Sequence, residues 1–202
     1  VLTAVREQDP ERIVFVPAMG WQDYNYIKYA RVAEEDPNAV VSFHYYLPML
    51  LSHYKMLAWV GYQGAVQYPG VVIPTQSDAD KYPQYASFHK TTYNADRIMG
   101  EMSNAASDGR NAGLAVHCGE FGCSKNVAEA MRLAWFTDMV AAMEANNIPW
   151  TLWECLDGGF GFVDMEYGIY RINCPLLKVL TGKELTDAEA KALLQKYGFK
   201  TE

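Results

Sequence analysis

The sequence predicts an α/β fold built around a parallel sheet, and two patterns support this prediction. Short runs of β-branched and aromatic residues are typical of strands, and each is nearly continuously apolar, as expected for a parallel strand covered on both faces. Stretches with helical periodicity separate these runs, so strand and helix alternate along the chain. The predicted strands cover residues 12–16, 39–46, 114–118 and 149–153.

The helical stretches carry recognisable ends. Residues 1–8 are typical of the end of an amphipathic helix that Asp9-Pro10 terminates, so we expect natural chain before Val1. Further helices are predicted over 24–35, 86–106, 124–146 and from Thr186, where Thr186 and Glu189 form a capping-box pattern. In the third of these, Ser124 is the expected N-cap, and apolar residues recur every four positions. They are Val127, Met131, Trp135, Met139 and Met143.

Composition narrows the function classes. A chain of 202 residues with 50% hydrophobic residues can bury one core, so a single domain over 1–202 is expected. The net charge of −7 argues against nucleic acid and anionic membranes as partners, and no apolar run has the length of a membrane span. The 4 Cys and 4 His lack the spacing of metal ligands, so neither a metal nor another cofactor is predicted. The disulfide state stays open.

The long segment 47–85 interrupts the alternation of strands and helices. It is rich in proline and glycine with interleaved aromatic residues, among them Trp59. A loop of this length in a compact domain is usually functional, and this one follows the C-terminal end of a predicted strand.

Chemically useful residues stand just past the C-terminal end of each predicted strand. Parallel strands bring these ends to one rim, so a carboxylate, an imidazole, phenols and indoles are expected to converge there. Such a set suits polar, uncharged, ring-shaped ligands. The residues are Trp21 after the first strand, His44 and Tyr46 at the second, Glu120 after the third, and Trp153 and Glu154 after the fourth.

Glu120 is the strongest candidate of this group. It lies in Gly119-Glu120-Phe121-Gly122, directly after an apolar strand, and the flanking glycines let the chain turn sharply and admit a ligand. His44 and Tyr46 are two apart and would point the same way from a strand, although a core histidine beside a packed tyrosine explains them equally well.

Two other patterns have competing interpretations. Trp153 could be a core residue, and Glu154 could be a second carboxylate, an ion-pair partner or a sugar ligand. The neighbouring His117 and Cys118 would face opposite ways on a strand, which argues against a Cys–His nucleophile. The glycine-rich run 158–162 lacks the Lys-Ser/Thr ending of a phosphate-binding loop and is expected to be a structural turn.

Taken in order, these motifs resemble the last strands of glycoside hydrolase family 5, a family of cellulases, mannanases and relatives on a (β/α)8 barrel. The resemblance covers about 12–164: His44-x-Tyr46 with Pro48, then Gly119-Glu120-Phe121-Gly122, Trp153-Glu154 and Gly159-Phe160-Gly161. The resemblance implies an α/β fold that is the C-terminal half of the barrel, strands five to eight. The segment 53–70, which includes Trp59, is also similar to loops of bacterial endoglucanases in this family.

The resemblance also implies roles for individual residues. Glu120 is similar to the nucleophile that forms a glycosyl-enzyme intermediate, and His44 and Tyr46 to the pair around the sugar that is cleaved, with Tyr46 bonded to the nucleophile. Trp153 is similar to the aromatic floor beneath that sugar. Trp21, Glu154 and Trp59 are expected to bind substrate, Trp21 at a less constant position of the family.

One departure from the family pattern concerns the acid/base. Members carry it as the Glu of an Asn-Glu pair after the fourth strand, and no Asn-Glu dipeptide occurs in this chain. A retaining mechanism needs two carboxyl groups about 5–5.5 Å apart. We therefore expect a partial catalytic domain that is inactive alone and pairs with the missing N-terminal half or another copy of the chain. The intact enzyme is expected to be a secreted endo-β-1,4-glycanase, most simply a cellulase acting on β-glucan.

Three other functions are compatible with the sequence. The chain could be a half-barrel that binds sugar without catalysis, because aromatic loops can hold a glucan alone. It could act on mannan or xylan within the same family. A small α/β enzyme of another class, with Glu154 as its second carboxylate, is the third alternative.

Overall fold

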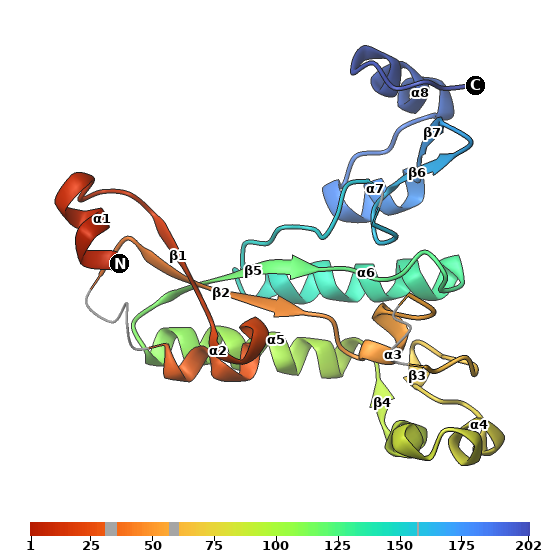
Figure 1. Cartoon of the computed structure of the whole chain (residues 1–202), viewed down its shortest axis with the longest axis horizontal. Helices are drawn as coiled ribbons and strands as arrows, with labels where there is room; N and C mark the ends of the chain where they lie inside the picture. Colours follow the sequence, from red (N-terminus) through yellow and green to blue (C-terminus); the bar gives the residue numbers. More distant parts are fainter. Residues whose placement is uncertain (31–35, 57–60, 157) are drawn as a thin grey trace. The chain divides into compact units, whose positions relative to one another are not determined.

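A computed structural model describes residues 1–30, 36–56, 61–156 and 158–202 (Figure 1). The chain forms two compact units. The first contains Val1–Tyr45, Gly100–Phe121 and Ala142–Thr151, and the second contains Tyr46–Met99, Gly122–Ala141 and Leu152–Glu202. Two helices, α5 (Ala95–Asn111) and α6 (Glu129–Ala145), contribute residues to both units. The single domain expected over 1–202 stays a prediction.

The first unit is built on a parallel sheet. Its strands β1 (Val14–Pro17), β2 (Ala39–Tyr45) and β5 (Ala115–Phe121) lie in the order β1-β2-β5 (Figure 1). Three of the four predicted strands are thus confirmed. The fourth is shorter than predicted: one parallel bridge joins Trp150 to Cys118, with the Cys118 amide bonded to the Pro149 carbonyl.

The two faces of this sheet differ in their burial. Val41, Phe43 and Tyr45 alternate along β2 and are at most 1% exposed. Ile13 and Phe15, by contrast, are 61% and 54% exposed. One face of the sheet is therefore buried, while Ile13, just before β1, and Phe15 in β1 lie open to solvent.

Short helical segments surround the sheet of the first unit. Helix α1 (Leu2–Gln8) ends at Asp9, as predicted. The four-residue segment α2 (Met19–Gln22) is turn-like, because Gly20 and Trp21 have positive φ angles. The predicted helix over 24–35 is a 3-10 helix, η1 (Tyr24–Tyr29), in its described part, and residues 31–35 lie outside the described residues.

The second unit combines short helices with two small antiparallel ribbons. Strands β3 (Gly70–Val71) and β4 (Thr92–Tyr93) form one, and β6 (Val163–Glu166) and β7 (Ile169–Ile172) form the other. Its helices are α3 (Met49–Ser52), α4 (Gln76–Lys81), η3 (Pro83–Lys90), α7 (Cys174–Thr181) and α8 (Asp187–Lys196). The predicted capping box at Thr186 is confirmed. No helix within the described ranges is both long and apolar enough to span a bilayer.

Two predicted helix starts were wrong. Helix α5 begins at Ala95 because the Asn94 side chain accepts the Arg97 amide, and η3 and β4 occupy the residues before it. Helix α6 begins at Glu129, and Ser124 is not its N-cap. The Ser124 hydroxyl instead donates to the Tyr54 carbonyl, which ties a turn before the helix to another segment of the second unit.

Candidate active site

Glu120 and His44 come together at the C-terminal ends of the neighbouring strands β5 and β2. The Nε2 atom of His44 lies 3.4 Å from Oε1 of Glu120, and the two side chains are 20% and 29% exposed. Both are therefore sheltered by the sheet and still reachable from solvent. The convergence expected from parallel strands holds for this pair.

Burial and charge act in opposite directions on His44. Burial lowers the pKa of the imidazole, while the negative charge of Glu120 raises it, and the net shift is downward. At neutral pH the imidazole is accordingly neutral.

Tyr46 belongs to the second unit and lies one residue past the end of β2. Its ring centroid is 4.9 Å from that of His53 and 5.9 Å from that of Phe160, so three rings form a cluster. Its carbonyl accepts the Ser52 hydroxyl at 2.5 Å. The predicted bond between Tyr46 and the nucleophile stays a prediction.

Trp153 and Glu154 differ in exposure. The Trp153 side chain is 46% exposed, so it is not the core residue that a strand tryptophan usually is. The Oε1 atom of Glu154 is buried and has no hydrogen-bond partner among the described residues. Its carboxylate lies against the backbone of Gly158, where an added Cβ would be 2.2 Å from that oxygen.

The remaining predicted substrate residues are Trp21 and Trp59. Trp21 is 99% exposed and has a φ of 62°, a left-handed conformation that is uncommon for a bulky residue. Asp23, two residues on, forms a parallel bridge with His44, so this turn runs beside the end of β2. Trp59 lies outside the described residues.

Two of the four cysteines, Cys118 and Cys123, are buried. All four are described, and none is in a disulfide. Burial raises the pKa of Cys118 well above its usual range and that of Cys123 to about 12, so both thiols stay protonated. Within the described ranges, no group of three His, Cys, Asp or Glu gathers as a set of metal ligands.

Sequence reasoning overlooked Arg132, a buried cation on α6. Its guanidinium bonds to the carbonyls of Cys123, Phe160 and Gly161 at 2.9, 2.5 and 2.8 Å. It thereby ties down both the segment before α6 and the glycine-rich run that follows Glu154. One sequence feature could have revealed it: Arg132 directly follows Met131, a member of the apolar stripe of that helix.

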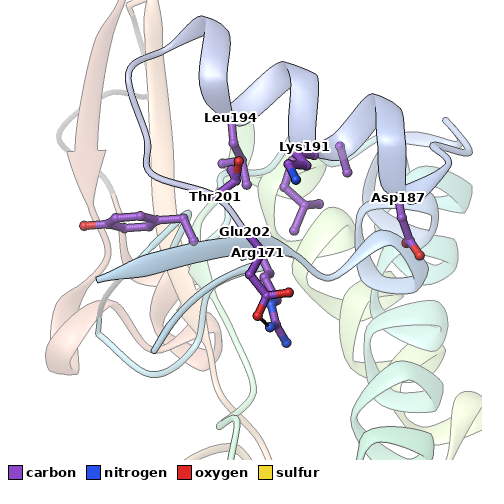
Figure 2. A pocket seen from close by; sticks show the side chains of 9 residues that line it. Arg171, Asp187, Lys191, Leu194, Thr201 and Glu202 are labelled. Atoms are coloured by element: carbon purple, nitrogen blue, oxygen red, sulfur yellow. Dashed lines mark hydrogen bonds and ion pairs between the residues drawn. The ribbon is translucent and has the colours of Figure 1, made fainter. Parts of the chain in front are cut away.

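Two cavities lie away from Glu120. One of about 600 Å³ in the first unit is lined by Ile13, Phe15 and His117 among others. The other, of about 370 Å³ in the second unit, lies between β7 and α8 (Figure 2). There Arg171 pairs with Glu202, and Lys191 comes from α8. Neither cavity is lined by the Glu120–His44 pair.

Comparison with known proteins places these residues in a family. The family model described as Cellulase (glycosyl hydrolase family 5) matches residues 1–159, which contain Glu120, His44, Trp153 and Glu154. The chain belongs to glycosyl hydrolase family 5. The family resemblance of the sequence motifs is thus confirmed, and the ribbon β6–β7 with helices α7 and α8 follows the matched region.

Curated relatives and solved structures are consistent with this family. The chain is 22% identical to Endoglucanase C of Acetivibrio thermocellus, with 83% of the chain and 48% of the relative aligned. It is 25% identical to Endoglucanase H of the same organism, with 84% and 15% aligned. The chain spans about half the length of the first of these relatives.

Similar folds occur among solved structures. A hyperthermophilic endo-β-1,4-glucanase solved with its substrate has a TM-score of 0.68 and 22% identity, covering 90% of this chain and 51% of that one. A Thermotoga maritima Cel5A structure with mannotriose has a TM-score of 0.64 and 19% identity, covering 89% and 51%. These likenesses show that the chain has an α/β fold, which it shares with about half the length of each of these two structures.

Proposed function

We propose that this chain is the nucleophile-bearing half of a retaining endo-β-1,4-glycanase that hydrolyses β-glucan. The observation that carries the proposal is the Glu120–His44 pair, 3.4 Å apart at the ends of adjacent parallel strands. The relatives are named endoglucanases, which supports a glucan substrate. In this proposal β1, β2, β5 and the segment at Trp150 correspond to strands five to eight of a (β/α)8 barrel.

Each residue then has a chemical task. Glu120 attacks the anomeric carbon and forms the glycosyl-enzyme intermediate, which water hydrolyses with retention. His44 orients the Glu120 carboxylate, and the phenol of Tyr46 donates a hydrogen bond to it. The exposed indole of Trp153 stacks on the sugar that is cleaved, and the carboxylate of Glu154 accepts a sugar hydroxyl. Trp21 and Trp59 extend the binding surface.

We infer that the acid/base comes from polypeptide outside these 202 residues. A retaining reaction needs a second carboxyl to protonate the leaving group, and the chain contains no Asn-Glu pair. The chain alone is then inactive on natural polysaccharides. The exposed Phe15 of β1 and Ile13 just before it favour an apolar protein partner there, which we propose to be the N-terminal half of the barrel or a second copy. Secretion follows from a polymeric substrate.

An activated 2-fluoro glycoside tests the nucleophile. Its dinitrophenolate leaving group departs without protonation, so the reagent reports on Glu120 even where the acid/base is absent. Peptide mapping should place one covalent label on Glu120 in the wild type and none in Glu120→Gln. The Glu144→Gln variant, at an exposed position of α6, is the matched control and should label at Glu120 as the wild type does. A label on Glu154, or none at all, overturns the assignment.

A second candidate function is sugar binding without catalysis. The exposed indoles of Trp21 and Trp153, at 99% and 46%, favour it because flat apolar rings stack on sugars. Hydrolysis of carboxymethyl-cellulose by these 202 residues alone excludes this function. Parallel assays on mannan and xylan separate the glucanase from a mannanase or xylanase, since a relative of this fold was solved with mannotriose.

A further inference from the structure

The pairing of β2 with β5 is irregular just before Glu120. Residues pair one to one from Val40↔Ala115 to Phe43↔Cys118, and the next pair is His44↔Glu120. Gly119 is therefore an extra residue in β5, a bulge with no partner of its own in β2.

The bulge decides which face of the sheet carries Glu120. In a regular strand, residues alternate between faces, so Glu120 would share the face of Cys118 and would pair with Tyr45. That face is closed: Cys118 is 0% and Tyr45 1% exposed. With Gly119 inserted, it is Phe121 that is 0% exposed, and the Glu120 carboxylate emerges beside His44.

A side chain at position 119 would collide with Ser42 of β2. A Cβ on Gly119 would lie 2.3 Å from the Oγ atom of Ser42, far closer than two such atoms can approach. Ser42 is 8% exposed, and its carbonyl accepts the Ala18 amide at 2.8 Å, so its backbone is fixed and only a rotation of the buried hydroxyl would relieve the collision. The thiol of Cys118 also donates to the Glu120 carbonyl across the bulge.

We propose that Gly119 and Ser42 are positioning residues: their contact holds the bulge in β5 that turns Glu120 from the buried face of the sheet to the face of His44. The proposal rests on the proposed function only for its activity readout. Its structural readout is the electrostatic coupling between Glu120 and His44, which exists whether or not the protein cleaves sugars.

The experiment compares four variants with the wild type in the full-length polypeptide that carries this chain. Gly119→Ala adds one methyl group at the contact, and Ser42→Gly in the same molecule removes the atom that it meets. Gly100→Ala is the matched control, because an added Cβ there has no atom within 4 Å. Glu120→Gln defines the uncoupled state. Far-UV circular dichroism and thermal unfolding establish that each variant is folded.

The structural readout is the pKa of His44, followed by NMR of labelled histidine and assigned with His44→Gln. The charge of Glu120 raises that pKa, so Glu120→Gln lowers it. Gly119→Ala should lower it toward the Glu120→Gln value, and adding Ser42→Gly should restore it. The rate of 2-fluoro glycoside labelling should fall about a hundredfold in Gly119→Ala, as expected for an ångström-scale displacement, and recover at least about tenfold in the double variant. Gly100→Ala should change neither readout.

The two proposals fail in different ways. A wild-type pKa and labelling rate in Gly119→Ala, or no recovery in the double variant, overturns the positioning role and leaves Glu120 as nucleophile. If Gly119→Ala does not fold, Ser42→Val, which crowds the same contact from β2, takes its place with the same expected results. If the His44 pKa responds as stated but no variant is labelled at Glu120, the positioning role stands and the proposed function fails.

Discussion

Replacing Arg132 with Met removes a buried cation that is held by backbone carbonyls. Arg132 is 4% exposed and donates to the carbonyls of Cys123, Phe160 and Gly161. Burial lowers its pKa, although an arginine still carries its proton at any working pH. Methionine fills similar space, so the substitution leaves three carbonyls without a donor rather than a large void.

The magnitude follows from these three bonds. Hydrogen bonds to a charged group contribute about 1.5–3 kcal/mol each, which gives roughly 4–9 kcal/mol for the three. Releasing the guanidinium from the interior returns several kcal/mol of desolvation cost. The free energy of unfolding should therefore fall by about 2–5 kcal/mol, and the run from Gly158 to Gly161 should loosen first.

Urea unfolding followed by tryptophan fluorescence measures this loss. The midpoint should drop while the slope with urea stays the same, because the surface exposed on unfolding is unchanged. Arg132→Lys should lie between the wild type and Arg132→Met, since an ammonium cannot reach all three carbonyls with the planar fork of a guanidinium. Arg110→Met, at an exposed position of α5, is the control and should stay within about 0.5 kcal/mol. An equally small change in Arg132→Met refutes the reasoning.

Three further measurements test other parts of the structure. Tyr68→Phe removes the hydroxyl that donates to Asp138 at 2.5 Å and should lower the free energy of unfolding by about 1–2 kcal/mol in urea; an unchanged midpoint contradicts this. Burial lowers the pKa of His53, so stability should be full above about pH 6.5 and fall as the pH drops through the folded-state value. His53→Gln should make the free energy of unfolding less dependent on pH in this range, and an equal dependence in the variant and the wild type contradicts this. Trp153→Ala should weaken cello-oligosaccharide binding roughly tenfold by calorimetry, whereas an unchanged Kd removes Trp153 from the site.

Local patterns predicted most of the secondary structure because they act over a few residues. The apolar runs at 12–16, 39–46 and 114–118 became strands, and the capping box at Thr186 starts α8. The predictions were wrong where a partner distant in sequence took the place of the local interaction that the pattern predicts. Ser124 bonds to the Tyr54 carbonyl instead of capping α6, and the segment at Trp150 makes only one bridge with β5.

The candidate site shows the same division. The sequence by itself determined that Glu120 follows an apolar strand between two glycines, in a motif order that belongs to glycosyl hydrolase family 5. Only the tertiary structure decided that Glu120 meets His44, because strand alternation alone would place it on the buried face. The reason is geometric: the extra residue Gly119 in β5 shifts the register against β2, and a pairing between strands distant in sequence leaves no local pattern.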